Sequence, residues 1–205
     1  MSDKTIYIIR HGQTDFNLKR IIQGSGIDSS LNETGRNQAK LFYEAYQDLN
    51  FELVVTSALQ RTHQTVNPFI EKNIPWIQMP ELNEINWGIH EGKEGTPAMV
   101  ENYDHITSQW RAGNYNIGIE KGESAQVLMD RLNIFIETIK QREEKLILVC
   151  SHGRAMRCLI CLLDGKPIKH MDDYGHHNTG LYIVQQKDNK FENITSNDIS
   201  HLKED

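Results

Sequence analysis

The chain has 205 residues and carries 22 basic against 28 acidic side chains, which gives a formal net charge of −6. That acidic balance argues against nucleic acid or an anionic membrane surface as the main partner. No apolar run approaches the length of a membrane span, and the first residues lack the features of a signal peptide. We therefore expect a single α/β domain over residues 1–205, located in the cytoplasm.

The first predicted element is a buried strand that ends in charged and polar residues. Thr5–Ile9 is a short apolar run rich in β-branched residues, which predicts a strand. Arg10, His11 and Gly12 follow it directly. In an open α/β sheet, ligands bind beyond the carboxyl ends of the strands, and a cation or imidazole buried there needs a partner or a ligand. An Arg-His-Gly tripeptide on its own is more typical of a solvated loop.

A second strand and a second arginine follow. Residues 17–30 are polar and rich in glycine, which predicts a loop, and a helix is expected from the N-cap Asn32 to about Leu49. Leu53–Thr56 reads as a buried strand, followed by a helix over residues 59–71 with Arg61 in its first turn. The first turn of a helix favours acidic residues, so Arg61 is either solvated or faces an anion bound at the helix N-terminus.

The middle of the chain has the character of an insertion. Pro75–Pro80 predicts a short strand, and the irregular segment after it is acidic. Thr96 followed by Pro97 is an N-cap with proline at the first helical position, which predicts a helix to about Arg111. Residues 87–122 contain no strong strand, so we expect them to form a lid over the sheet.

The last third predicts a helix with an apolar face, the strand Leu146–Cys150, a second helix and a hairpin. The strand ends at Ser151-His152-Gly153, and the hairpin pairs residues 180–185 with 191–197. Cys158 and Cys161 have metal or redox spacing, but they lie in an apolar helical run and no second Cys or His pair completes a zinc set. We predict core cysteines and no metal site.

The pattern at the first strand recurs. One buried strand ends in Arg10-His11-Gly12, another in Ser151-His152-Gly153, and a third in Ser57 with Arg61 just beyond. If the three strands are parallel neighbours, two histidines and two arginines converge at one edge of the sheet. That combination predicts a site for a dianion with a nucleophile or base in it.

These residues together resemble the histidine phosphatase superfamily, also called the phosphoglycerate mutase-like fold. The resemblance covers nearly the whole chain, because several modest motifs occur in the order in which the family has them. The segments that carry it are Ile9–Gln13 with Asn17, Gln23-Gly24, Leu31 with Gly35, Gln38 and Ala39, Ser57–Thr65, Leu82–Gly92, Gly122–Ser124 and Ser151–Gly153.

The resemblance implies a three-layer α/β/α fold with a mostly parallel central sheet and a phosphohistidine mechanism. It makes His11 the nucleophile and Glu84 the proton donor. The residues that it assigns to the phosphoryl oxygens are Arg10, Asn17, Arg61 and His152. The choice of Glu84 comes from the motif alone, because Glu81, Glu91 and Glu94 lie in the same acidic segment.

We predict a phosphomonoesterase that acts on a small phosphorylated metabolite. A neutral imidazole is a competent nucleophile, and two arginines can supply the positive charge for phosphoryl transfer without a metal or other cofactor. The alternatives are a cofactor-dependent phosphoglycerate mutase and a non-catalytic phosphate-binding module. The mutase is disfavoured because Lys93, Arg111 and Lys121 are the only cations in residues 87–122. Neither the substrate nor an oligomeric state follows from the sequence.

Overall fold

The computed structural model describes residues 3–188 and 190–203, and within them the chain forms a six-stranded sheet. The order of the strands is β3-β2-β4-β1-β5-β6. The first four of these run parallel, while β5 is antiparallel to both β1 and β6. Their bounds are β1 Lys4–Arg10, β2 Leu53–Thr56, β3 Trp76–Gln78, β4 Leu146–Ser151, β5 Leu181–Lys187 and β6 Lys190–Asp198.

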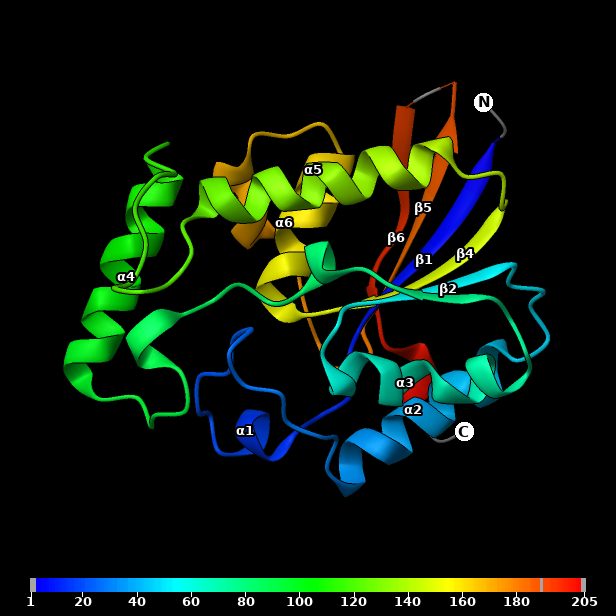
Figure 1. Cartoon of the computed structure of the whole chain (residues 1–205), viewed down its shortest axis with the longest axis horizontal. Coiled ribbons are helices and arrows are strands. Elements are labelled where there is room, and N and C mark those ends of the chain that lie inside the picture. Colours follow the sequence, from blue (N-terminus) through cyan, green and yellow to red (C-terminus); the bar gives the residue numbers. More distant parts are fainter. Residues whose placement is uncertain (1–2, 189, 204–205) are drawn as a thin grey trace.

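Helices cover both faces of the sheet and so give the predicted three layers. Figure 1 shows α5 and α6 on one face, α2 and α3 on the other, and α4 at the end of the molecule beyond the sheet. The bounds are α1 Asp15–Leu18, α2 Glu33–Tyr46, α3 Gln60–Glu71, α4 Pro97–Arg111, α5 Ala125–Gln141 and α6 Gly153–Leu163, with short 3₁₀ helices at Pro80–Leu82, Gly88–His90, Ile168–Asp173 and Ser200–Leu202. Within the described ranges, no helix combines the length and the apolar character that crossing a bilayer requires.

The layers follow from the alternation of side chains along the strands. In β1, Ile6 and Ile8 pack with α5 and α6, whereas Tyr7 and Ile9 pack with α2 and α3. Successive residues of a strand point to opposite faces, so an uninterrupted apolar run is what a strand covered on both sides needs. The buried run Thr5–Ile9 therefore places β1 inside the sheet, where β4 and β5 flank it.

The structure differs from the sequence expectations mainly at the ends of elements. The predicted loop over residues 17–30 begins inside α1, which the sequence reading missed. This helix is a single turn closed by a capping box: the Asn17 backbone N–H donates to the Thr14 hydroxyl at 3.2 Å, and the Asn17 Oδ1 accepts from the Thr14 backbone N–H at 3.2 Å. One turn is too short to show helical periodicity. Helix α2 ends at Tyr46 rather than near Leu49, and the centre of the β5–β6 turn, residue 189, lies outside the described residues.

Two glycines let the segment after β1 lie directly against the first turn of α2. A Cβ on Gly12 would stand 2.6 Å from the backbone oxygen of Gly35. A Cβ on Gly35 would stand 2.1 Å from the backbone oxygen of Gln13. Both contacts are with backbone, which cannot swing aside as a flexible side chain can. This close approach fixes the position of the residue between β1 and Gly12, which is His11.

We predict that Gly35→Ala destabilises the protein by about 1–3 kcal/mol, because the added methyl group forces the two backbone segments apart. The loss should appear although alanine is the better helix former. Asn37→Ala is the matched control, since Asn37 is exposed on the same helix and its replacement should be neutral or slightly stabilising. Urea unfolding measures both variants. Equal stability of Gly35→Ala and the unmodified protein would contradict the packing argument.

Candidate active site

The parallel pairing of the strands brings the predicted site residues together. Arg10 is opposite Ser151 in the register of β1 and β4, so His11 and His152 follow at the same edge of the sheet. Their ring centroids are 5.2 Å apart. Strand β2 pairs with the other side of β4, and the helix after it carries Arg61 beside His152. The expected convergence of two histidines and two arginines is therefore present in the structure.

His11 is buried, and the carbonyl oxygen of the next residue fixes its tautomer. The imidazole Nδ1 lies 2.7 Å from the carbonyl oxygen of Gly12, which can only accept, so Nδ1 carries the proton and donates it. The other nitrogen, Nε2, is then left unprotonated. Burial lowers the pKa of His11 well below 6.5, and the nearby charges of Arg61 and Arg10 lower it further. His11 is thus a neutral imidazole with a free lone pair.

Two guanidinium groups, one buried and one half-buried, act on His11. Arg61 is fully buried, and its Nη atoms donate to the carbonyl oxygens of Ile27 and Gly24. Burial lowers the pKa of Arg61 to about 10. Arg10 donates through Nη1 to the carbonyl oxygen of His176 at 2.7 Å, while its buried Nε has no partner among the described residues. An unpaired buried donor is costly, and an anion at this edge would satisfy it.

His152 stands beside His11, and protein groups bond both of its ring nitrogens. Arg61 donates from Nε to the Nδ1 of His152 at 3.2 Å, so Nδ1 is unprotonated. The remaining ring proton is on Nε2, which donates to the Ser57 hydroxyl at 2.8 Å. Burial, followed by the charge of Arg61, lowers the pKa of His152 well below 6.5. Its assigned contact with a phosphoryl oxygen stays a prediction.

The Glu84 carboxylate lies at the N-terminus of α6, the helix that begins directly after His152. It is 7% exposed and accepts from the backbone N–H groups of Arg154 and Ala155 at 3.0 and 2.9 Å, and from that of Ile85 at 2.9 Å. Free N–H groups at a helix N-terminus favour an anion, which explains why a carboxylate is stable there. Its negative charge also acts on both Arg10 and Arg61, raising the pKa of each against the effect of burial.

The structure separates Glu84 from its acidic neighbours. Glu91 accepts from the backbone N–H of Trp87 at 2.8 Å. Glu81 is half-buried and Glu94 is exposed, and neither they nor Glu91 line the cavity that contains His11. Of these four carboxylates, Glu84 alone lines it.

Asn17 is held so that its amide nitrogen is left for another partner. Its Oδ1 accepts from the backbone N–H and the hydroxyl of Thr14 at 3.2 Å each, and from the Asn178 amide at 3.4 Å. Asn178 also donates to the carbonyl oxygen of His11 at 2.9 Å. Asn17 lines the cavity together with Arg10 and His11. The structure therefore places the N–H₂ donor of Asn17 beside Arg10 and His11.

A cavity of about 540 Å³ opens onto His11. Of the predicted residues, Arg10, His11, Asn17 and Glu84 line it, whereas Arg61 and His152 lie outside its lining. The lining also includes Arg154 and Trp87 and the α4 residues Met99, Val100 and Tyr103. Sequence reasoning missed all of these. Arg154 had one available signal, since it lies two residues after His152 in the first turn of a helix. The α4 side chains had none, because nothing in the sequence shows which face of that helix meets the cavity.

Comparison with known proteins identifies the family. The chain matches the histidine phosphatase superfamily (branch 1) over residues 6–199. It is 25% identical over 201 residues to phosphoserine phosphatase 1 of Hydrogenobacter thermophilus, with 97% of this chain and 94% of that protein covered. It is 29% identical over 204 residues to the Shigella dysenteriae protein named "Probable phosphoglycerate mutase GpmB", with 96% and 94% covered. The solved structure of Bacillus stearothermophilus YhfR is similar with a TM-score of 0.85 at 25% identity, covering 98% of this chain and 100% of that chain.

The chain belongs to the histidine phosphatase superfamily, since the family match spans nearly all of it. The predicted family and the predicted α/β/α fold are both confirmed. A relative named as a phosphatase and aligned over nearly its whole length supports a phosphoric monoester hydrolase.

The lowered pKa values of His11 and His152 predict a loss of stability in acid. In the unfolded chain both histidines bind protons near pH 6.5, whereas the folded protein keeps them neutral to lower pH. The free energy of unfolding should therefore fall as the pH drops below 6.5, by up to about 1.4 kcal/mol per pH unit for each histidine.

Urea unfolding in phosphate-free buffer at several pH values between 7.5 and 5 measures this slope. His11→Gln removes one of the two groups, so the slope of that variant should be smaller. An identical slope in His11→Gln and the unmodified protein would show that His11 is not held neutral by the fold.

Proposed function

We propose that this protein hydrolyses small phosphate monoesters through a phosphohistidine on His11. The observation that carries the proposal is the neutral His11 imidazole, whose unprotonated Nε2 lies in the positive field of the half-buried Arg10 and the buried Arg61. Lone pair and positive charge together are what an in-line attack on a phosphate dianion requires.

In the first step, His11 Nε2 forms a bond to phosphorus and the bond from phosphorus to the ester oxygen breaks. Before this bond breaks, the Glu84 carboxylate takes up a proton from solvent, which the approach of the phosphate dianion favours. The resulting carboxyl gives that proton to the ester oxygen, so that an alcohol leaves rather than an alkoxide and Glu84 becomes a carboxylate again. In the second step, water attacks the phosphohistidine while the Glu84 carboxylate takes the proton from it. The products are inorganic phosphate and the neutral histidine with which the cycle began.

The charges of the site support this sequence of steps. Phosphoryl transfer depends mainly on positioning and on stabilising the charge of the three equatorial oxygens. We assign that role to Arg10 and Arg61, with Asn17 as a neutral donor and with the Nε2 proton of His152 turned from Ser57 to a phosphoryl oxygen. The guanidinium forks supply the positive charge, so the proposed steps use no metal.

We further propose that residues 87–122 act as a lid and leave water as the acceptor. Helix α4 contributes Met99, Val100 and Tyr103 to the cavity, and none of these is a cation. A mutase must hold an anionic acceptor and exclude water, and this wall offers such an acceptor no charged partner. The relative named as a phosphoglycerate mutase keeps that activity as the second candidate.

A trapped intermediate tests the proposal. Rapid acid-free quenching of enzyme mixed with ³²P-labelled monoester should capture a phosphoryl group that is labile in acid and stable in base. Chasing the labelled enzyme with water and unlabelled 3-phosphoglycerate then shows which acceptor wins. We expect nearly all label to appear as inorganic phosphate. Transfer mainly to phosphoglycerate would make the protein a mutase, and binding of the ester with neither label nor turnover would leave a binding module.

His11→Ala is the decisive variant of this experiment, because it removes the nucleophile and should abolish both the label and the turnover. Asn37→Ala, exposed on α2 and remote from the cavity lining, should retain both. Near-normal turnover in a folded His11→Ala protein would rule out the covalent mechanism.

The role of Glu84 is tested by its dependence on the leaving group. An acid contributes most when the departing oxygen is strongly basic, with typical effects of about 10²–10⁴-fold. Glu84→Gln should therefore lower kcat/KM much more for an alkyl phosphate than for p-nitrophenyl phosphate. Glutamine keeps an oxygen that can accept from the N–H groups at the start of α6.

Glu81→Gln and Glu94→Gln are the controls, since both side chains lie outside the cavity lining. They should leave both rates nearly unchanged. Equal losses of kcat/KM on the two esters for Glu84→Gln would mean that Glu84 has a structural role and is not the general acid.

A further inference from the structure

The part of the cavity beyond the phosphate site has apolar walls from two separate segments. Phe16 and Ile22 line it from the segment that follows β1. Trp87, Met99 and Val100 line it from the proposed lid. The two segments also join through a bridge between Ile21 and Glu94. A leaving group attached to a phosphate at His11 would therefore extend between these two walls.

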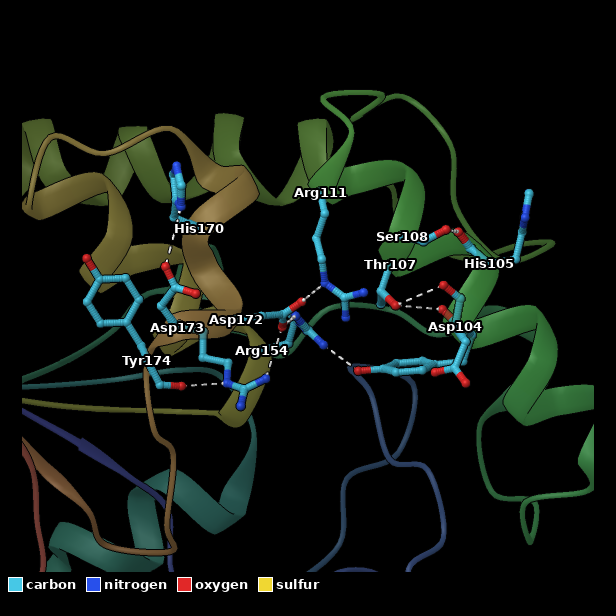
Figure 2. A network of polar contacts seen from close by, with 12 residues as sticks. Asp104, His105, Thr107, Ser108, Arg111, Arg154, His170, Asp172, Asp173 and Tyr174 are labelled. Atoms are coloured by element: carbon cyan, nitrogen blue, oxygen red, sulfur yellow. Dashed lines mark hydrogen bonds and ion pairs between the residues drawn. The ribbon is translucent and has the colours of Figure 1, made fainter.

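One cation, Arg154, belongs to this wall, but protein groups already hold its donors. Its Nη1 is paired with the Asp172 carboxylate, and its Nη2 donates to the Tyr103 hydroxyl. Figure 2 shows Arg154 and Arg111 both directed at Asp172. The Arg154 side chain is only 5% exposed. An anionic group on a substrate would have to displace Asp172 or Tyr103 to use this guanidinium.

Aromatic rings surround Arg154. Its Cζ lies 5.9 Å from the ring centroid of Trp87 and 5.8 Å from those of Tyr103 and Trp110. At this distance the guanidinium is attracted electrostatically by the faces of the three rings. The rings also exclude water from Arg154. Arg154 thus fixes the positions of Trp87 and Tyr103, so that its contribution to the cavity is an aromatic surface rather than an open charge.

The other titratable groups around the cavity do not add a second anion site in its depth. The pKa of His176 is lowered to about 3 by burial and by Arg10, which leaves this imidazole neutral. Arg20 is exposed at the rim, where water and salt weaken its attraction for an anion. Arg10 belongs to the phosphate site itself.

We propose that this cavity selects phosphate monoesters whose leaving group is uncharged and apolar, and that it discriminates against leaving groups with a carboxylate or a second phosphate. The proposal rests on the proposed phosphatase function and names its substrate class. Burying an apolar group between Phe16 and Met99 removes apolar surface from water, whereas burying an unpaired carboxylate there has a large desolvation cost.

Alkyl esters with leaving groups of similar basicity test this selectivity. We expect kcat/KM for 2-phenylethyl phosphate to exceed that for ethyl phosphate by at least about tenfold, since even one added methylene in an apolar pocket gives about tenfold or more. Phosphoserine and 3-phosphoglycerate should be no better than ethyl phosphate. A higher kcat/KM for either anionic ester than for 2-phenylethyl phosphate would overturn the proposal and make Arg154 an anion-binding residue.

Two lysine variants in the first turn of α4 distinguish the effect of a charge in the cavity wall from that of a charge outside it. Met99→Lys places a cation in the cavity lining and should lower the preference for 2-phenylethyl phosphate over phosphoserine by about tenfold or more. Ala98→Lys adds the same charge at an exposed neighbour outside the lining, and should change that preference by less than about twofold. Equal effects of the two variants would mean that net charge, not the wall, sets the preference.

The selectivity and the phosphatase function can fail separately. Turnover of p-nitrophenyl phosphate with a trapped phosphohistidine, combined with a preference for anionic esters, would refute the apolar subsite and keep the phosphatase. Absence of any phosphohistidine or phosphate release from every ester would refute both.

Discussion

The site depends on bringing two guanidinium groups, the buried Arg61 and the half-buried Arg10, to one edge of a sheet. A charge withdrawn from water is stable only with partners, and the partners here are carbonyl oxygens and nearby carboxylates, among which Glu84 acts on both arginines. The compensation is incomplete, because the Arg10 Nε has no partner among the described residues. Burial together with this positive charge lowers the pKa values of His11 and His152, and the charge is available to a phosphate dianion.

The fold supplies that arrangement through simple geometry. Parallel strands end at the same edge, so three strands of the sheet deliver His11, His152 and the helix with Arg61 to one place. Short-range contacts then fix the side chains. The Thr65 hydroxyl accepts from the Gly12 backbone at 2.9 Å and donates to the Arg61 carbonyl at 2.7 Å, which ties the His11 segment to α3. Positioning to this accuracy is what phosphoryl transfer demands.

The sequence predicted the fold and the convergence of the two histidines and two arginines because both depend on local patterns. Buried strands show as apolar runs, and the residues that end them can be read directly. Glu84 could not be chosen from chemistry alone, because its position at the start of α6 depends on a contact with residues about seventy positions away. Arg154 was missed for a similar reason, since its partners Asp172 and Tyr103 come from two other segments. The single turn of α1 has too few residues for a periodic signal.

The shape of the cavity bears on how one site can both exclude and admit water. During the first step, an apolar leaving group would fill the space between the two walls and keep water from the phosphorus, which strengthens every charge interaction around it. Once that alcohol departs, the cavity of about 540 Å³ has room for many waters, each of which occupies about 30 Å³ in the liquid. Glu84 lies in the same lining, so a water entering from the vacated side meets the carboxylate that can take its proton. For an anionic acceptor that must stay bound between the two steps, the described residues of these walls offer only the exposed Arg20, because Arg154 is already paired with Asp172. The geometry therefore favours hydrolysis over return of the phosphoryl group to a substrate.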